Sequence, residues 1–209
     1  MKLSFVDPYC YPNTTILRNL ADIRDARLLE STEAALVASQ APRIETSSPA
    51  VNDLKQLLSI HRILFGKLYP FAGKFRMHTG RMTKTRASGS TVVYCDSAFI
   101  PPQADLIFAA LAAEKYLVGL NGQDFAQRAA YFYGEFDAIH PFREGNSRTL
   151  RLFFSAIAKN AGFQLDWRIL AAEDLRPQLY AARDRAVMHG DSVPLAALLS
   201  SILSPRTAS

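Results

Sequence analysis

The sequence predicts a mainly α-helical domain of seven or eight helices that carries one short β-hairpin. Apolar residues recur at the 3.6-residue spacing of a helix through most of the chain, and a single stretch rich in strand-forming residues interrupts that pattern. The chain has 209 residues, of which 49% are hydrophobic. This length suits one domain with a sizeable core, and this composition is not that of a disordered protein.

In the first third of the chain, apolar periodicity predicts two helices. One is expected from Thr15 to Val37, after an irregular start that contains Pro8 and Pro12. A loop is expected from Ala41 to Pro49, because the segment includes two prolines. The second helix is expected from about residue 50 to Phe65, before a run of glycine and proline ends it.

The β-hairpin is expected between residues 74 and 100, where Thr91-Val92-Val93-Tyr94 is rich in strand formers. After it, prolines, the turn at Asn121-Gly122 and Gly162 mark the ends of five further helices. These helices are expected at about residues 102–118, 124–140, 147–162, 171–189 and 194–203.

Charge and cysteine content narrow the class of protein. The formal net charge is +5, and the segment from Leu54 to Cys95 holds eight lysines and arginines without an acidic residue. Such a stretch suits a nucleotide, a nucleic acid or an acidic protein face. No apolar run reaches the roughly 20 residues that span a bilayer, and the first residues are not those of a signal peptide. Two cysteines, Cys10 and Cys95, form no disulfide framework, so a cytoplasmic protein is expected.

The segment from His140 to Arg151 is polar although it joins two strongly apolar helices. Gly145 lets backbone approach a ligand closely, and Asn146 and Ser147 would open a helix whose free N–H groups face the loop. Arg148 and Arg151 are spaced to lie on one face of that helix, where their guanidinium groups can bind phosphate. The pattern indicates an anion-binding site.

Two further side chains of the segment suggest chemistry at that anion. Glu144 would repel a phosphate unless a cation such as Mg²⁺ lies between them. His140 is the group in this loop whose pKa suits the uptake of a proton near neutral pH. The segment therefore predicts a phosphate cradle, a metal-binding carboxylate and a base.

This segment resembles the signature of the Fic family, H-x-F-x-(D/E)-G-N-x-R-x-x-R. Tyr11-Pro12 with Leu17-Arg18-Asn19 is similar to the family's N-terminal segment, and the stretch from Phe71 to Arg76 is similar to the entry to its hairpin flap. The matching signature positions are His140, Phe142, Glu144, Gly145, Asn146, Arg148 and Arg151. The resemblance implies the Fic fold and a single Fic domain over residues 1–209, with its core at about 9–203, its flap hairpin at about 74–100 and its active-site loop at 140–148.

Fic proteins typically move AMP from ATP to a hydroxyl side chain of another protein, so the resemblance implies a protein adenylyltransferase. By matching positions, His140 would deprotonate the target Tyr, Thr or Ser, and Glu144 would hold Mg²⁺ between the α- and β-phosphates. Gly145, Asn146 and the backbone of Ser147 would form the anion hole. Arg148 and Arg151 would bind the β- and γ-phosphates.

The resemblance also implies protein partners. The hairpin, with Lys84, Val92, Val93 and Tyr94, would dock a target segment by strand pairing, and small toxins of this layout often modify type II topoisomerases. Many relatives are inhibited by the Glu of an (S/T)-x-x-x-E-(G/N) helix, and the only Glu followed by Gly or Asn here is Glu144. We therefore expect a toxin whose separate small antitoxin supplies that Glu to Arg151.

Two alternatives stay open. Ser147 stands where the usual signature has glycine, and Doc-type relatives with lysine there have a kinase-like activity. A Fic-fold kinase, or another nucleotidyl or phosphocholine transferase, is the first alternative. The second is a degenerate nucleic-acid-binding module that uses the basic stretch 54–95, although the complete set of motif residues argues against it.

Overall fold

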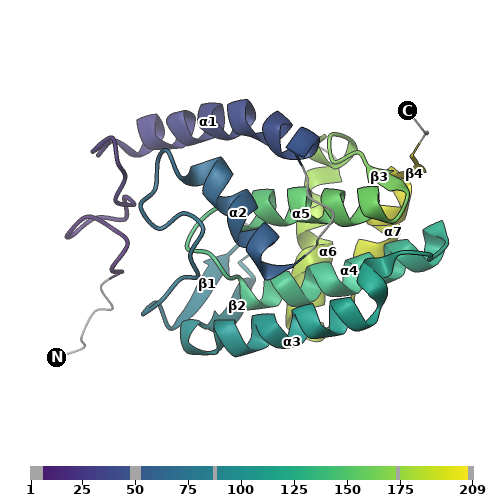
Figure 1. Ribbon diagram of the computed structural model, residues 1–209. Coiled ribbons are helices and arrows are strands. Elements are labelled where there is room, and N and C mark those ends of the chain that lie inside the picture. The colour runs from purple at the N-terminus through teal and green to yellow at the C-terminus, as the bar shows by residue number, and fades with distance from the viewer. Residues whose placement is uncertain (1–6, 48–52, 87–88, 173–174, 207–209) are drawn as a thin grey trace.

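The computed structural model describes residues 7–47, 53–86, 89–172 and 175–206, and in them it confirms the predicted mainly helical fold. The centre is α4 (Gly122–Ile139), which packs against four other helices (Figure 1). These helices are α3 (Ile100–Ala113), α5 (Asn146–Asn160), α6 (Leu175–His189) and α7 (Val193–Ile202). The loop from α4 to α5 therefore leaves and re-enters the core of the molecule.

Two more helices bring the described helices to seven. Helix α1 (Ala26–Ser47) packs against α2 (Leu54–Phe65), which crosses beneath it at an angle, and both contact α5 (Figure 1). The side chain of Asp53 accepts a hydrogen bond from the Gln56 N–H and so caps the start of α2. The residues just before Asp53, where the predicted start of this helix falls, lie outside the described residues.

Aromatic side chains on α4 and α5 form the middle of the core. Their burial removes large apolar surfaces from water, which is the main favourable contribution to folding. The residues concerned, all at most 1% exposed, are Phe125, Phe132, Tyr133 and Phe136 on α4 and Phe153 and Phe154 on α5.

The predicted hairpin consists of β1 (Arg81–Thr85) and β2 (Thr91–Asp96). The strands are antiparallel, with Thr83 opposite Val93 and an irregularity between Arg81 and Thr83. β2 rests on α4 and α6, and the 3₁₀ turn Ser97–Phe99 leads on to α3. The hairpin thus lies over the end of α4, beside the loop that follows it (Figure 1).

A second small sheet was not predicted. β3 (Phe163–Leu165), which follows α5, pairs antiparallel with β4 (Leu203–Pro205) at the end of α7. Both strands are three residues long, which is too short for a periodic pattern to reveal them. Two further 3₁₀ turns, Lys115–Leu117 and Ile169–Ala171, connect helices.

The predicted first helix begins too early. Residues 15–25 are not helical, although their apolar residues approximate the spacing of a helix. The Asn19 side chain accepts from the Ile23 N–H and donates to the Ile23 carbonyl, so it competes with helical hydrogen bonds in this segment. The helix starts instead after Asp25, whose carboxylate accepts from the Leu28 N–H.

The predicted loop from Ala41 to Pro49 is also wrong up to Ser47, because α1 continues through Pro42 to Ser47. A proline inside a helix removes a hydrogen bond and normally kinks or ends it. Burial of Gln40 and Ile44 on either side of Pro42 shows that packing against the rest of the molecule outweighs this cost. Residues 48–49 lie outside the described part.

None of the helices in the described part of the chain combines the length and the apolar character needed to cross a bilayer.

Candidate active site

The loop between α4 and α5 begins and ends on left-handed backbone. His140 ends α4 at φ 44° and ψ 64°, and Gly145 caps α5 at φ 81°. A Cβ added at Gly145 would lie 2.3 Å from Cε2 of Phe65, so both the backbone angle and the space require glycine. The loop is therefore drawn tightly against α2.

Asn146 closes the loop on itself. Its Oδ1 accepts from the Phe142 N–H at 2.8 Å, and its Nδ2 donates to the Phe142 carbonyl at 2.7 Å. The Phe142 ring is fully buried and stacks on the His61 ring with centroids 3.8 Å apart. The Asn146 side chain thus uses its oxygen and one amide hydrogen to hold the loop, and among the described residues its second amide hydrogen has no such partner.

His61 on α2 is a structural residue of the site that sequence reasoning missed. Its Nδ1 accepts from the Gly73 N–H at 2.8 Å, so Nε2 carries the proton and donates to the Glu144 carbonyl at 2.9 Å. Burial lowers the pKa of His61 to about 4, which keeps the ring neutral. The sequence feature that could have revealed it is the position of His61 one turn after Leu57, on the apolar face of the helix.

Arg76 joins the loop to the hairpin. It is 1% exposed, and its guanidinium donates to the carbonyls of His140 (2.7 Å), Gly80 (2.9 Å) and Cys95 (2.5 Å). Its backbone N–H donates to the Pro141 carbonyl at 2.8 Å. A charged hydrogen-bond donor shared in this way fixes the hairpin relative to the left-handed turn at His140.

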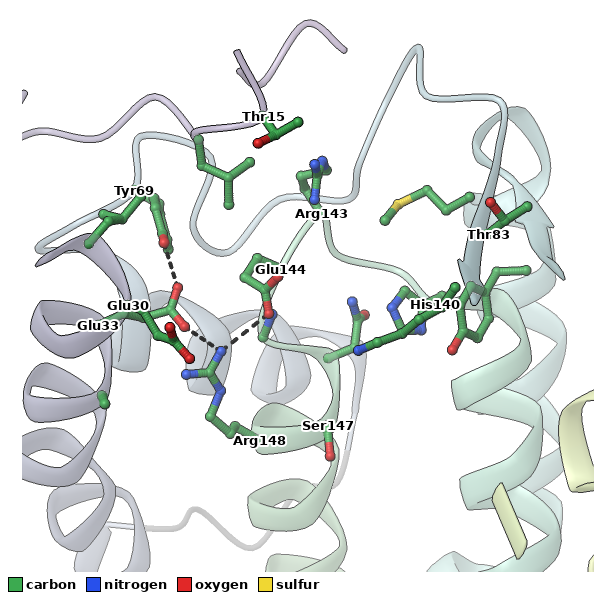
Figure 2. A pocket seen from close by; sticks show the side chains of 18 of the residues that line it. Thr15, Glu30, Glu33, Tyr69, Thr83, His140, Arg143, Glu144, Ser147 and Arg148 are labelled. Carbon is green, nitrogen blue, oxygen red and sulfur yellow. Dashed lines mark hydrogen bonds and ion pairs between the residues drawn. The ribbon is translucent and has the colours of Figure 1, made fainter. Parts of the chain in front are cut away.

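All seven predicted residues from His140 to Arg151 line one pocket of about 770 Å³ (Figure 2). The pocket lies at the amino end of α5, where free N–H groups and the helix dipole favour an anion. Residues of α1, β1 and α6 complete its walls. The predicted residues that it brings together are His140, Glu144, Gly145, Asn146, Ser147, Arg148 and Arg151.

The imidazole of His140 is held between the hairpin and the core. The Tyr94 ring stacks on it with centroids 3.8 Å apart, and Oδ1 of Asp137 lies 3.5 Å from its Nδ1. Burial lowers the pKa of His140, against the opposing charge of Asp137. The ring is therefore neutral at pH 7 and can accept a proton there.

Arg148 lies between two carboxylates, as Figure 2 shows. One of its terminal nitrogens is 2.5 Å from Glu33 on α1 and 3.2 Å from Glu144. Glu33 also accepts a hydrogen bond from the Tyr69 hydroxyl, which holds it in place. Sequence reasoning missed Glu33, which is 9% exposed and lies one turn after the buried Leu29 of α1. It orients the Arg148 side chain at the pocket wall.

Ser147 and Arg151 occupy the first turns of α5. Nη1 of Arg183, on α6, lies 3.1 Å from the Ser147 hydroxyl, while Nε of Arg151 donates to the Ser147 carbonyl at 3.3 Å. Burial lowers the pKa of the Arg151 guanidinium, and no Asp or Glu in the described residues forms an ion pair with it. Arg151 is therefore a cation of the pocket that an added anion can pair with.

The four predicted flap residues fall into a buried pair and an exposed pair, because successive side chains of a strand point to opposite faces. Val92 and Tyr94 are buried against the core, whereas Lys84 and Val93 are exposed. Lys84 and Tyr94 line the pocket, and Val92 and Val93 do not. The Arg86 guanidinium donates to Asp184 at 2.7 Å, which fastens the hairpin to α6.

A divalent cation fits beside Glu144 only together with ligands that the chain does not supply. Glu144 is partly exposed at the pocket, and one of its oxygens already accepts from the Gly145 N–H. The described residues contain no cluster of three or more metal-binding side chains. One carboxylate with substrate phosphates is the usual way in which proteins hold Mg²⁺, so the residues present fit that ion.

The fold and the pocket together place a neutral histidine, two arginines and the amino end of α5 around one cavity, an arrangement that suits an anionic ligand. A model of the Fic/DOC family matches residues 52–158. The chain belongs to the Fic/DOC family.

Individual relatives agree with that family. The chain is 38% identical over 162 residues to the protein adenylyltransferase VbhT of Bartonella schoenbuchensis, an alignment that covers 77% of this chain and 32% of VbhT. It is 31% identical over 198 residues to the probable protein adenylyltransferase Fic of Escherichia coli, covering 95% of this chain and 92% of that protein. The chain therefore spans about a third of VbhT and nearly all of the Escherichia coli protein.

Solved structures show the same fold. BepC of Bartonella tribocorum, with bound AMPPNP, superimposes with a TM-score of 0.82 at 26% identity, over 95% of this chain and 97% of that chain. A Fic domain from Bartonella quintana, with bound ADP, gives a TM-score of 0.82 at 28% identity, over 95% of both chains.

Proposed function

We propose that this chain is a protein adenylyltransferase that transfers AMP from ATP to a hydroxyl side chain of another protein. The observation that carries the proposal is the meeting of His140, Glu144 and the amino end of α5 in one pocket with both motif arginines. Relatives named as protein adenylyltransferases and similar domains with bound AMPPNP or ADP support it.

In the proposed reaction His140 takes the proton from the target hydroxyl. The hydroxyl oxygen then forms a bond to the α-phosphorus, the bond from that phosphorus to the bridging oxygen breaks, and pyrophosphate leaves with the electron pair. Backbone N–H groups at Asn146 and Ser147 stabilise the charge on the α-phosphate, and Gly145, whose N–H is bonded to Glu144, lets the backbone come close to it. Arg148 and Arg151 hold the β- and γ-phosphates. These residues act by position and charge.

Glu144 is the residue that would hold Mg²⁺. When bound, the ion neutralises phosphate charge and fixes the orientation of the triphosphate. The Glu144 carboxylate also meets Arg148, so it orients a phosphate-binding cation on the same side of the pocket.

The hairpin is the proposed docking site for the target. β1 borders the pocket through Met82, Thr83 and Lys84. One edge of β1 is paired with β2, and the opposite edge of β1 is free. An extended target segment can add to the free edge of β1 by main-chain hydrogen bonds, which places its hydroxyl near His140. A type II topoisomerase is the candidate target to test first.

A nucleic-acid-binding module is not favoured by the placement of the basic stretch. Arg76 is buried among carbonyl groups, and Arg86 is paired with Asp184. The cations of residues 54–95 therefore do not all form one exposed face. Cys10 and Cys95 are free thiols, and a reducing cytoplasm is the proposed setting.

The test is the intact mass of candidate target proteins after incubation with ATP, Mg²⁺ and this chain. An increase in the mass of a target protein that corresponds to one attached AMP group supports the proposal, provided that it is absent with His140→Ala. Transfer of a single phosphate instead of AMP would establish the kinase alternative.

The proposed toxin role rests on Arg151, which lies in the pocket without an ion-pair partner from residues 7–47, 53–86, 89–172 and 175–206. A small antitoxin that inserts a Glu there would compete with the γ-phosphate. Expression of the chain alone in bacteria is expected to arrest growth, and His140→Ala to relieve the arrest. Normal growth with an enzyme that is active in extracts would contradict the toxin role.

A further inference from the structure

A buried atom of His140 lacks a hydrogen-bond partner. Nδ1 is inaccessible to water, and in the described residues no acceptor reaches it with hydrogen-bond geometry. Oδ1 of Asp137 lies 3.5 Å away, one turn earlier on α4. Such contacts are often long in a free enzyme and shorten when substrate binds. Asp137 is thus placed to accept a hydrogen bond from an Nδ1–H group.

The Asp137 carboxylate is itself held rigidly. Nε of Arg183 donates to Oδ2 at 3.0 Å and Nη2 donates to Oδ1 at 2.8 Å, a two-point contact that prevents rotation. Both residues are buried, with Asp137 1% exposed and Arg183 4% exposed. Burial alone would raise the pKa of Asp137, but the charge of Arg183 outweighs it and keeps that pKa well below its usual range. The carboxylate stays an anionic acceptor.

The third arm of Arg183 reaches the anion-binding helix. Its Nη1 lies 3.1 Å from the Ser147 hydroxyl in the first turn of α5. The hydroxyl of Ser147, which stands where the family signature has glycine, is therefore engaged by α6. Through Arg183, the histidine end of α4 and the phosphate end of α5 form one connected unit.

We propose that Asp137, clamped by Arg183, is a positioning residue that fixes His140 with its proton on Nδ1 and leaves Nε2 to accept the proton of the target hydroxyl. The inference rests on the proposed function of His140 as a base. An imidazole with its proton on Nε2 could not accept a second one there, so the tautomer decides whether the ring can act.

The remaining neighbours of the ring are consistent with this role. Tyr94 of the hairpin covers one face of His140, and burial raises the pKa of Tyr94 to about 12, so it stays neutral. Arg76 donates to the backbone carbonyl of His140, and its charge, like that of Arg183, favours a neutral ring. Asp137, on α4, is the carboxylate that faces Nδ1.

The direct test is nitrogen NMR of the full chain, labelled on its four histidines, without nucleotide. His140→Ala assigns the signal. We expect His140 to carry its proton on Nδ1 and His61 to carry its proton on Nε2, as its two hydrogen bonds require, so His61 is an internal reference of opposite type. A His140 proton on Nε2 in the wild-type chain would overturn the proposal.

Two double variants separate positioning from packing. Asp137→Asn with Arg183→Met keeps an oxygen near Nδ1, whereas Asp137→Ala with Arg183→Met removes it, and neither leaves a lone buried charge. Because both pairs lack Arg183, the comparison between them isolates the oxygen at residue 137. We expect the asparagine pair to keep the Nδ1–H signal and the alanine pair to lose it. We also expect kcat of the alanine pair to be roughly 10- to 100-fold below that of the asparagine pair, at equal KM for ATP. Equal losses in the two pairs would overturn the proposal.

The NMR spectra test the positioning of His140, and the activity assay tests the proposed function, so each proposal can be refuted without the other. An Nδ1–H signal in a chain that transfers no AMP would refute the proposed function and leave the positioning intact. AMP transfer by a chain whose His140 carries its proton on Nε2 would refute the positioning alone.

Discussion

Single residues determine the shape of the active-site loop, and Gly145 is the clearest case. Its φ of 81° disfavours any side chain, and a Cβ would also meet the Phe65 ring at 2.3 Å. The neighbouring Asn146 then clamps the turn through the backbone of Phe142. The signature glycine and asparagine are therefore explained by loop geometry as well as by the anion that the loop is proposed to bind.

Gly145→Ala should destabilise the protein by roughly 2–4 kcal/mol, the sum of left-handed strain and a clash with a packed ring. Gly162 is the matched control, since its φ is 87° and a Cβ there would meet nothing within 4 Å. Gly162→Ala should cost about 1–2 kcal/mol, from the backbone strain alone. Urea unfolding of both variants measures the difference, and equal losses would show that the Phe65 contact does not matter.

The buried ring of His61 should make the stability of the protein depend on pH. Its pKa is about 4 in the folded protein against 6.5 in the unfolded chain, so the unfolded state takes up its proton first. Stability from this residue is therefore complete above pH 6.5 and falls as the pH drops, by about 2 kcal/mol at pH 5 and about 3 kcal/mol near pH 4.

The measurement compares the free energy of unfolding of wild-type protein and His61→Gln between pH 8 and pH 5. The variant is expected to be less stable at pH 8. Its free energy of unfolding should fall less between pH 8 and pH 5, because a histidine with a lowered pKa has been removed. A drop of the same size in both proteins would mean that the His61 ring is not shielded as its contacts indicate.

At the scale of elements, Arg76 couples the hairpin to the loop after α4. Its donors satisfy carbonyls from both, and they hold His140 on left-handed backbone. A lysine has the charge but not the planar fork, so it can reach fewer of these carbonyls. The hairpin would then be less firmly tied to the site.

Arg76→Lys should raise the rate of amide hydrogen exchange in β1 and β2 and lower the free energy of unfolding by about 1–3 kcal/mol, as carbonyls lose their partners. Arg81→Lys, an exposed position at the start of β1, is the control and should change neither. Unaltered exchange in Arg76→Lys would show that the hairpin is held by other contacts.

Sequence periodicity predicted most helices because their apolar faces are long and regular, as α4 and α5 show. It failed at residues 15–25, where Asn19 bonds to the backbone, and at Pro42, where packing of Ile44 keeps the helix intact. The motif residues were found because they are contiguous in sequence. Glu33 and His61 were missed because tertiary contacts bring them to the site. Asp137 lies one turn before His140 and was missed because its role depends on the ion pair with Arg183 of α6.

In the whole molecule, parts of the chain that are far apart in sequence meet at one pocket. Helix α1 contributes Glu33, the hairpin contributes Lys84 and Tyr94, the loop contributes His140, and α6 contributes Arg183. The amino end of α5 forms the floor, so the dipole of a 15-residue helix points into the pocket. The proposed positioning of a triphosphate against His140 therefore depends on the complete helical fold.

His140 and the amino end of α5 are proposed to act together on ATP and a target hydroxyl. The decisive experiment incubates the chain and a candidate target with ATP labelled on the α-phosphate or on the γ-phosphate. We expect protein-bound label from the α position only, and we expect His140→Ala to abolish this labelling while it still binds ATP. Label from the γ position, or α-label that persists without His140, would contradict it.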